Sequence, residues 1–190
     1  ISRSFIVDLN LTLSCTLAVS LHSINKEQTL DMIILGKTVI TGIGATLIMD
    51  IWSLLQKYLL KAPPLNYALV GRWILWLPRG KYWHYTIATT PRIQGEMFTG
   101  WMFHYLIGVV FAFVPLMLNA TAWFSEPSLK VGLLVGLSTL FAPFIILQPA
   151  LGFGFAASRT PRPWLARLLS LLTHLAYGGG LYISALMMSA

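Results

Sequence analysis

Charge and cysteine are both scarce in this chain of 190 residues. Only 10% of the residues are charged and 56% are hydrophobic, with a mean hydropathy of +0.72, whereas a soluble globular domain typically carries roughly 25% charged residues. A soluble domain this poor in charge would not cover its own surface with polar groups. The single cysteine, Cys15, excludes an internal disulfide framework and a metal cluster built on cysteine.

Sequence patterns of common enzyme classes are missing as well. The chain has no nucleophile elbow, no Walker sequence and no H-E-x-x-H pattern. The stretch GFGFAASR, residues 152–159, is rich in small residues, but it does not follow a strand, and we interpret it as an ordinary turn. No catalytic residue is therefore predicted.

Four apolar runs are long enough to cross a bilayer, which takes about 20 residues at 1.5 Å each. These runs are 32–55, 97–118, 129–148 and 165–188. In lipid each run has to be helical, because a spanning helix satisfies its own backbone hydrogen bonds. The predicted fold is an all-α integral membrane protein with a bundle of four transmembrane helices.

Two segments stand apart from these runs. Residues 1–31 start with Ile1, precede the first methionine, Met32, and are expected to be a leader or a non-native extension that is poorly ordered or a short helix. Residues 32–190 would then form a single membrane domain. Segment 65–77, which lies between Pro63–Pro64 and Pro78, is too short to span and mixes tryptophans with arginines. This mixture predicts an amphipathic helix lying in the headgroup region, with a re-entrant segment as the less favoured alternative.

The distribution of the cations predicts the topology. The connection between the first and second runs holds six cations. Arg159 and Arg162 lie between the third and fourth runs, and Arg167 lies just inside the fourth, whereas Lys130, at the start of the third run, is the only cation near the connection between the second and third. By the positive-inside rule, the two basic connections face the cytoplasm. The net charge of +7 is thus a topology signal. We expect the lipid bilayer as the partner, and no nucleic acid.

A few polar side chains interrupt the runs at similar depth. Asp50 lies seven residues before Lys57, about 10 Å from the cytoplasmic charges, and His104 lies eight residues after Glu96, about 12 Å in. His174 and Gln148 complete this polar layer. Small residues precede and follow Asp50, His104 and His174 at helical spacing, which is typical of faces where membrane helices approach closely. We expect Asp50 to face the bundle interior and to pair with one of the two histidines.

Three functions fit the polar layer. It can fix helix packing alone. Asp50 can instead accept a proton or a cation in a transport or proton-relay path, with Arg72, Arg79 and Arg159 drawing anions to a cytoplasmic mouth. Because four helices are few for a transporter, this function favours a homodimer.

The third function is a cofactor site. His104 and His174 can be the axial ligands of a haem b, or can join Asp50 in a metal site of two histidines and one carboxylate. No local spacing motif supports either ligand set. Proton-linked or small-solute transport is the interpretation that we favour.

Several stretches resemble a bacterial family of small multi-pass inner-membrane proteins, the domain-of-unknown-function 2938 family. The stretches are GIGATLIMDIW (42–52), LNYALVGRW (65–73), GEMFTGWMFHYLIG (95–108), QPALGFGFAASRTP (148–161) and HLAYGGGLY (174–182). The resemblance extends from Met32 to the C-terminus. It implies an inner-membrane protein without an assigned activity, so it transfers no catalytic residue.

The topology is testable with reporter fusions. A periplasmic reporter enzyme fused after Lys81 is expected to be inactive, because the positive-inside rule retains this connection in the cytoplasm. A fusion placed in the connection between the second and third runs is the positive control. Reporter activity after Lys81 would contradict the predicted orientation.

Overall fold

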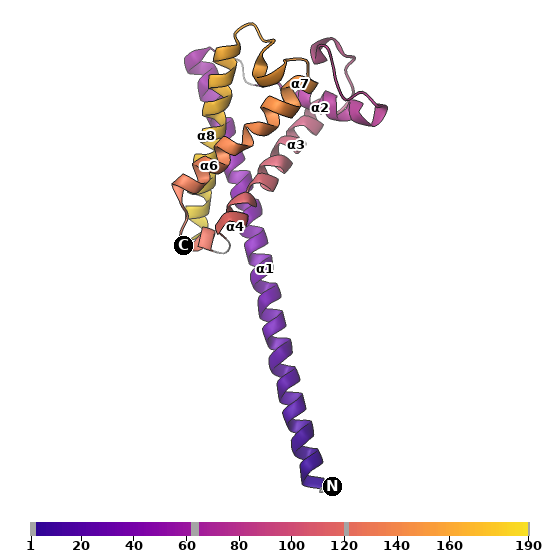
Figure 1. Cartoon of the computed structure of the whole chain (residues 1–190), viewed down its shortest axis with the longest axis vertical. Coiled ribbons are helices and arrows are strands. Elements are labelled where there is room, and N and C mark those ends of the chain that lie inside the picture. The colour runs from indigo at the N-terminus through magenta and orange to yellow at the C-terminus, as the bar shows by residue number, and fades with distance from the viewer. Residues whose placement is uncertain (1–2, 62–64, 120–121, 190) are drawn as a thin grey trace. The chain divides into compact units, whose positions relative to one another are not determined.

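The computed structural model describes residues 3–61, 65–119 and 122–189, with side chains from residue 25 onward except that of residue 119 (Figure 1). Residues 1–2 lie outside the described residues, and so do Pro63 and Pro64, the two prolines that precede segment 65–77. The chain divides into two units, Ile1–Lys37 and Thr38–Ala190. Helix α1 (Arg3–Leu60) begins in the first unit and ends in the second. Residues 3–31 are helical and continue into the first apolar run, while their role as a leader stays a prediction.

The second unit is helical, and its described residues contain no strand. After α1 its α-helices are α2 (Tyr67–Trp76), α3 (Glu96–Phe111), α4 (Val114–Asn119), α5 (Ala122–Ser125), α6 (Leu129–Thr139), α7 (Gln148–Ala150) and α8 (Pro163–Met188). Three 3-10 turns, η1 (Leu77–Arg79), η2 (Ile87–Thr89) and η4 (Phe155–Ala157), and one π-helical turn, η3 (Ala142–Leu147), complete it.

The prediction of four helices long and apolar enough to cross a membrane is confirmed for the described residues. These segments are Asn25–Leu60, Glu96–Leu118, Leu129–Ala150 and Pro163–Met188. Each of them contains most or all of one predicted run. The third is not a regular α-helix, because it continues from α6 through the π-turn η3 into α7.

The helices approach each other at glycines. A Cβ atom on Gly42 of α1 would lie 2.6 Å from the backbone Cα of Val109 in α3. A Cβ atom on Gly178 of α8 would lie 2.5 Å from the carbonyl oxygen of Gly132 in α6. Hydrogen alone fits at these positions, so the backbones themselves are in contact. This packing agrees with the expected small-residue faces.

Helix α2 pairs antiparallel with the first half of α3. A Cβ atom on Gly71 would collide with the carbonyl oxygen of Glu96, and one on Gly100 with that of Tyr67. Tyr67, at the beginning of α2, therefore lies beside Gly100 of α3, whereas Gly71 lies beside Glu96, one turn earlier in α3. Helix α2 thus follows α3 lengthwise, while its predicted position in the headgroup region stays a prediction.

Arg72 fastens the segment after α2 to this helix pair. Its side chain is 4% exposed, and its Nε and Nη2 atoms each donate a 2.8 Å hydrogen bond to the Glu96 carboxylate. Its Nη1 atom donates to the carbonyl oxygens of Ile87, Ala88 and Thr90 at 3.0–3.3 Å. The hydrogen bonds to Glu96 raise the pKa of Arg72, so the guanidinium stays charged.

The two basic connections are hydrogen-bonded to each other. The backbone N–H groups of His84 and Ile87 donate to the carbonyl oxygens of Ala150 and Leu151 at 2.9 and 3.1 Å. Gly152 follows with a φ of +89°, a conformation that favours glycine. Burial, and then the charge of Lys81, lowers the pKa of His84, which favours a neutral ring in this interface. Connections that are bonded in this way lie on the same side of any membrane that the helices cross.

The helix contacts predict different effects for two neighbouring glycines. Gly178→Ala is expected to lower the unfolding free energy by about 1–3 kcal/mol, because the new methyl group meets only backbone atoms of α6. Gly179→Ala is the matched control, since a Cβ atom there meets nothing within 4 Å. Thermal unfolding of the purified protein in one detergent measures both. Equal melting temperatures for the two variants would contradict the packing.

A second stability prediction concerns Arg72. Arg72→Gln removes the ion-pair partner of the partly buried Glu96 and the guanidinium donor to three carbonyl oxygens, and is expected to cost about 3 kcal/mol. Arg79→Gln changes an exposed cation and should alter the unfolding temperature little. If the two variants unfold at the same temperature, Arg72 does not fasten the connection.

Candidate functional site

Asp50 is the centre of a polar cluster formed by three helices. Its Oδ1 atom lies 3.0 Å from His104 Nε2 of α3 and accepts a hydrogen bond from the Tyr67 hydroxyl of α2 at 3.3 Å. Its Oδ2 atom accepts from the Tyr105 hydroxyl at 3.0 Å. The partner of Asp50 is therefore His104, one of the two expected histidines. Three donors satisfy a carboxylate that would otherwise be costly in an apolar bundle.

Aromatic rings hold this cluster in place. The Tyr67 ring stacks on the His104 imidazole with centroids 4.3 Å apart and lies 4.5 Å from the ring of Trp101. The Tyr67 hydroxyl is also 3.0 Å from His104 Nε2. The first residue of α2 thus contacts α1 and α3 at one point.

His174 lies in a separate polar pair on α8 and α6. Its Nδ1 atom is 2.7 Å from the Thr139 hydroxyl oxygen, and this hydroxyl is 2.6 Å from the carbonyl oxygen of Gly136. A carbonyl oxygen only accepts, so the single hydroxyl hydrogen of Thr139 points at Gly136. Thr139 then accepts from His174, and the ring hydrogen is on Nδ1. In the neutral ring Nε2 carries a bare lone pair.

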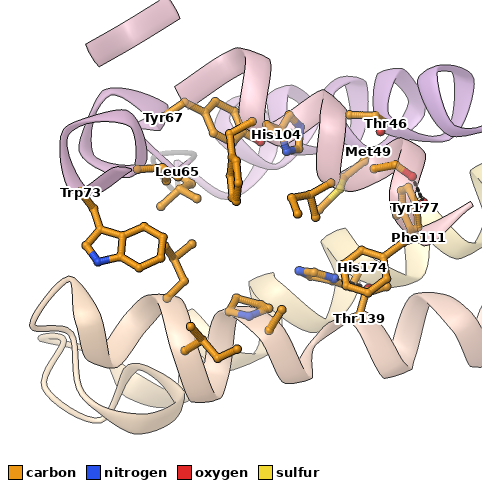
Figure 2. Close-up of a pocket in the computed structure, with 18 residues that line it drawn as sticks. Thr46, Met49, Leu65, Tyr67, Trp73, His104, Phe111, Thr139, His174 and Tyr177 are labelled. Carbon is orange, nitrogen blue, oxygen red and sulfur yellow. Dashed lines mark hydrogen bonds between the residues drawn. The ribbon is translucent and has the colours of Figure 1, made fainter. Parts of the chain in front are cut away.

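A cavity of about 300 Å³ separates the two polar groups (Figure 2). His104 lines it on one side, with Thr46 and Met49 of α1 nearby, and His174 lines the opposite side. Asp50 is not part of the lining and lies behind His104. The walls are almost entirely hydrocarbon, supplied by α1, α2, α3, α6, η3 and α8. The arrangement is an apolar chamber with few polar groups, as small-molecule sites commonly are.

The π-turn η3 forms part of this wall. Pro143 lies at its beginning and lacks a backbone N–H, so the regular hydrogen-bond pattern of α6 cannot continue through it. Pro143, Ala142 and Ile146 all line the cavity. Single π-turns inside helices occur frequently at functional sites. The irregular backbone at Pro143 is thus located at the cavity.

The remaining predicted site residues lie elsewhere. Gln148 does not line the cavity, and its Oε1 atom is buried without a hydrogen-bond partner among the described residues. Arg79 and Arg159 are exposed. Arg72 was expected as a third cation of a basic mouth, and this expectation is wrong because its guanidinium is buried against Glu96. Of the three cations of the predicted basic mouth, Arg79 and Arg159 remain as candidates.

The predicted metal triad is not assembled. His104 bonds to Asp50, whereas His174 bonds to Thr139 on the far side of the cavity. Within the described part of the chain, no group of three histidine, cysteine, aspartate or glutamate side chains is arranged to hold a metal ion.

Sequence reasoning missed Tyr67, Tyr105 and Thr139. Tyr105 follows His104 directly, so a search for hydroxyl donors beside the polar residues would have found it. Tyr67 gave no such signal, since its contact with Asp50 depends on how α2 folds back onto α3. Thr139 resembles any other helical threonine until its histidine partner is known.

The chain matches a known protein family in sequence. A family model described as "Protein of unknown function (DUF2938)" matches residues 39–188. This match contains the polar cluster, the cavity and both basic connections. No curated protein and no solved structure matches the chain.

Proposed function

The chain belongs to this DUF2938 family of proteins of unknown function, and we propose that it is a multi-pass protein of a bacterial inner membrane that moves a small solute in exchange for, or together with, a proton. Four helices of sufficient length and apolarity support the membrane location. The cations of the two bonded connections support a cytoplasmic location for both.

One observation carries the transport proposal. The cavity has the Asp50–His104 pair behind one wall and a second histidine, His174, on the other. An ionisable pair beside a chamber within a helix bundle is a functional site by default, because such groups are costly in lipid. The solute would occupy the chamber, and the pair would hold the proton.

The hydrogen bonds suggest how a proton and the chamber are coupled. The Asp50 carboxylate accepts from Tyr67, Tyr105 and His104 when it is ionised. A proton on Oδ2 removes the negative charge and adds an O–H donor, so the hydrogen bonds from all three donors lose their charge assistance and become weaker. Tyr67 begins α2, and Tyr67, Val70 and Trp73 of this segment line the chamber. Protonation would therefore loosen a helix that forms one chamber wall.

Asp50 and His104 would act as one unit in this step. His104 Nε2 and Asp50 Oδ1 are 3.0 Å apart, so the two side chains would share the transported proton. The exposed Arg79 and Arg159 would give the cytoplasmic entrance its positive potential. A homodimer remains part of the proposal, since the described residues of a single copy contain only four helices long and apolar enough to span.

Asp50→Asn tests the proposal against a role in packing alone. The amide keeps the size and most hydrogen bonds of the carboxylate, so we expect the melting temperature to change little, while proton coupling is lost. Small-molecule pools in cells and medium are compared by mass spectrometry for cells expressing wild type, Asp50→Asn or no protein. Asp31→Asn, the same chemical change at an exposed residue of the first unit, is the control.

Wild type and Asp31→Asn should shift at least one pool between cells and medium, and Asp50→Asn should resemble cells without the protein. If Asp50→Asn is as stable and as active as wild type, the cluster only fixes packing. The same conclusion would follow if no pool responds to the wild-type protein.

A further inference from the structure

We propose that the chamber selects an uncharged, largely apolar small molecule that donates one hydrogen bond, from a hydroxyl or N–H group, to Nε2 of His174. This proposal rests on the chamber being the solute site of the proposed transporter, and names the class of solute. A volume of about 300 Å³ is at the lower end of the range of about 300–1,000 Å³ for small-molecule pockets.

The hydroxyl hydrogens of the chamber are already committed. Thr46 donates to the Gly42 carbonyl at 2.8 Å, and Tyr177 donates to the Gly108 carbonyl at 2.6 Å. Thr139 donates to its own helix, to the carbonyl of Gly136. Tyr67 is engaged with the Asp50–His104 pair. The chamber therefore has no spare hydroxyl donor for a ligand.

His174 presents an acceptor instead. Its hydrogen is on Nδ1, facing Thr139, and none of the described residues bonds to its Nε2 atom. Figure 2 shows the His174 ring projecting from α8 into the chamber. His104 turns its Nε2 atom to the Asp50 carboxylate and the Tyr67 hydroxyl, so this atom is already engaged. A ligand is thus recognised through a donor of its own.

Charged ligands fit this surface poorly. An anion would face the Nε2 lone pair and hydrocarbon walls without any free donor. A cation would lose its hydration in the same apolar surroundings, and the Asp50 oxygens already have three donors. A lipid acyl chain would fill the space but would leave Nε2 unsatisfied. An uncharged, largely apolar molecule with one donor fits the hydrocarbon walls and donates to the lone pair of His174 Nε2.

A matched probe pair tests this selection. The full chain in lipid nanodiscs is titrated calorimetrically with 1-naphthol, which has a donor hydroxyl, and with 1-methoxynaphthalene, which lacks it. We expect 1-naphthol to bind at least about tenfold more tightly, the ratio for one buried hydrogen bond that is lost. In His174→Phe the ring is kept and the acceptor removed, so this preference should disappear.

Thr139→Val provides a second variant in case His174→Phe fails to fold. Valine keeps the shape but accepts no hydrogen bond, so Nδ1 loses the partner that fixes the ring hydrogen. Nitrogen NMR of histidine-labelled protein should show the Nδ1–H form in wild type and a mixture of both ring forms in Thr139→Val. The naphthol preference should fall accordingly.

Several results would overturn the inference. They are equal affinity for the two probes, tighter binding of 1-naphthoate or of 1-naphthylmethylammonium, an Nε2–H form in wild type, and a chamber so filled by lipid that neither probe binds. The binding assay needs no proton gradient and no flux. It can therefore succeed when the transport test fails, and a failed probe preference leaves an Asp50-dependent flux intact.

Discussion

Close backbone contact at glycines is the constraint on which the rest of this structure depends. In the proposed bilayer, apolar side chains gain nothing from leaving lipid for one another, so helices have to associate by packing. The contacts are closest within two pairs, α2 with α3 and α6 with α8, where Gly71 and Gly178 meet facing backbone. The cavity is the space that remains between these pairs, with α1 alongside both. The helices within each pair are already in backbone contact, so they do not spread to fill this space.

The polar groups follow from the same arrangement. Asp50 is tolerated on α1 because the α2–α3 pair brings the hydroxyls of Tyr67 and Tyr105 and the imidazole of His104 to it. In the middle of α2, Arg72 donates to Glu96 and to three carbonyl oxygens. Helix α2 is thus held at its beginning by a titratable carboxylate and at its middle by a permanent ion pair. Of these two attachments, the one at Asp50 is the one that a proton would weaken in the proposed transporter.

His174 shows how one hydrogen bond decides the chemistry of a chamber. A histidine alone offers either a donor or an acceptor, depending on its ring hydrogen. Thr139 removes this choice, since its own hydrogen is held by Gly136 and its oxygen accepts from Nδ1. The ligand specificity that we propose therefore originates in Thr139, whose hydroxyl hydrogen is bonded to a carbonyl of its own helix and not to the ligand.

The sequence by itself determined the four long apolar helices, the basic connections and the positions of Asp50, His104 and His174 along those helices, because length, hydropathy and helical period are local properties. Only the tertiary structure decided which histidine meets Asp50, that Tyr67 joins them, and that Arg72 is buried. Each of these depends on the register between helices, which is set by glycine contacts and by the reversal before α2 and not by any periodicity along the chain. The wrong expectation for Arg72 has the same origin, since its partner Glu96 is 24 residues away and no local pattern connects the two.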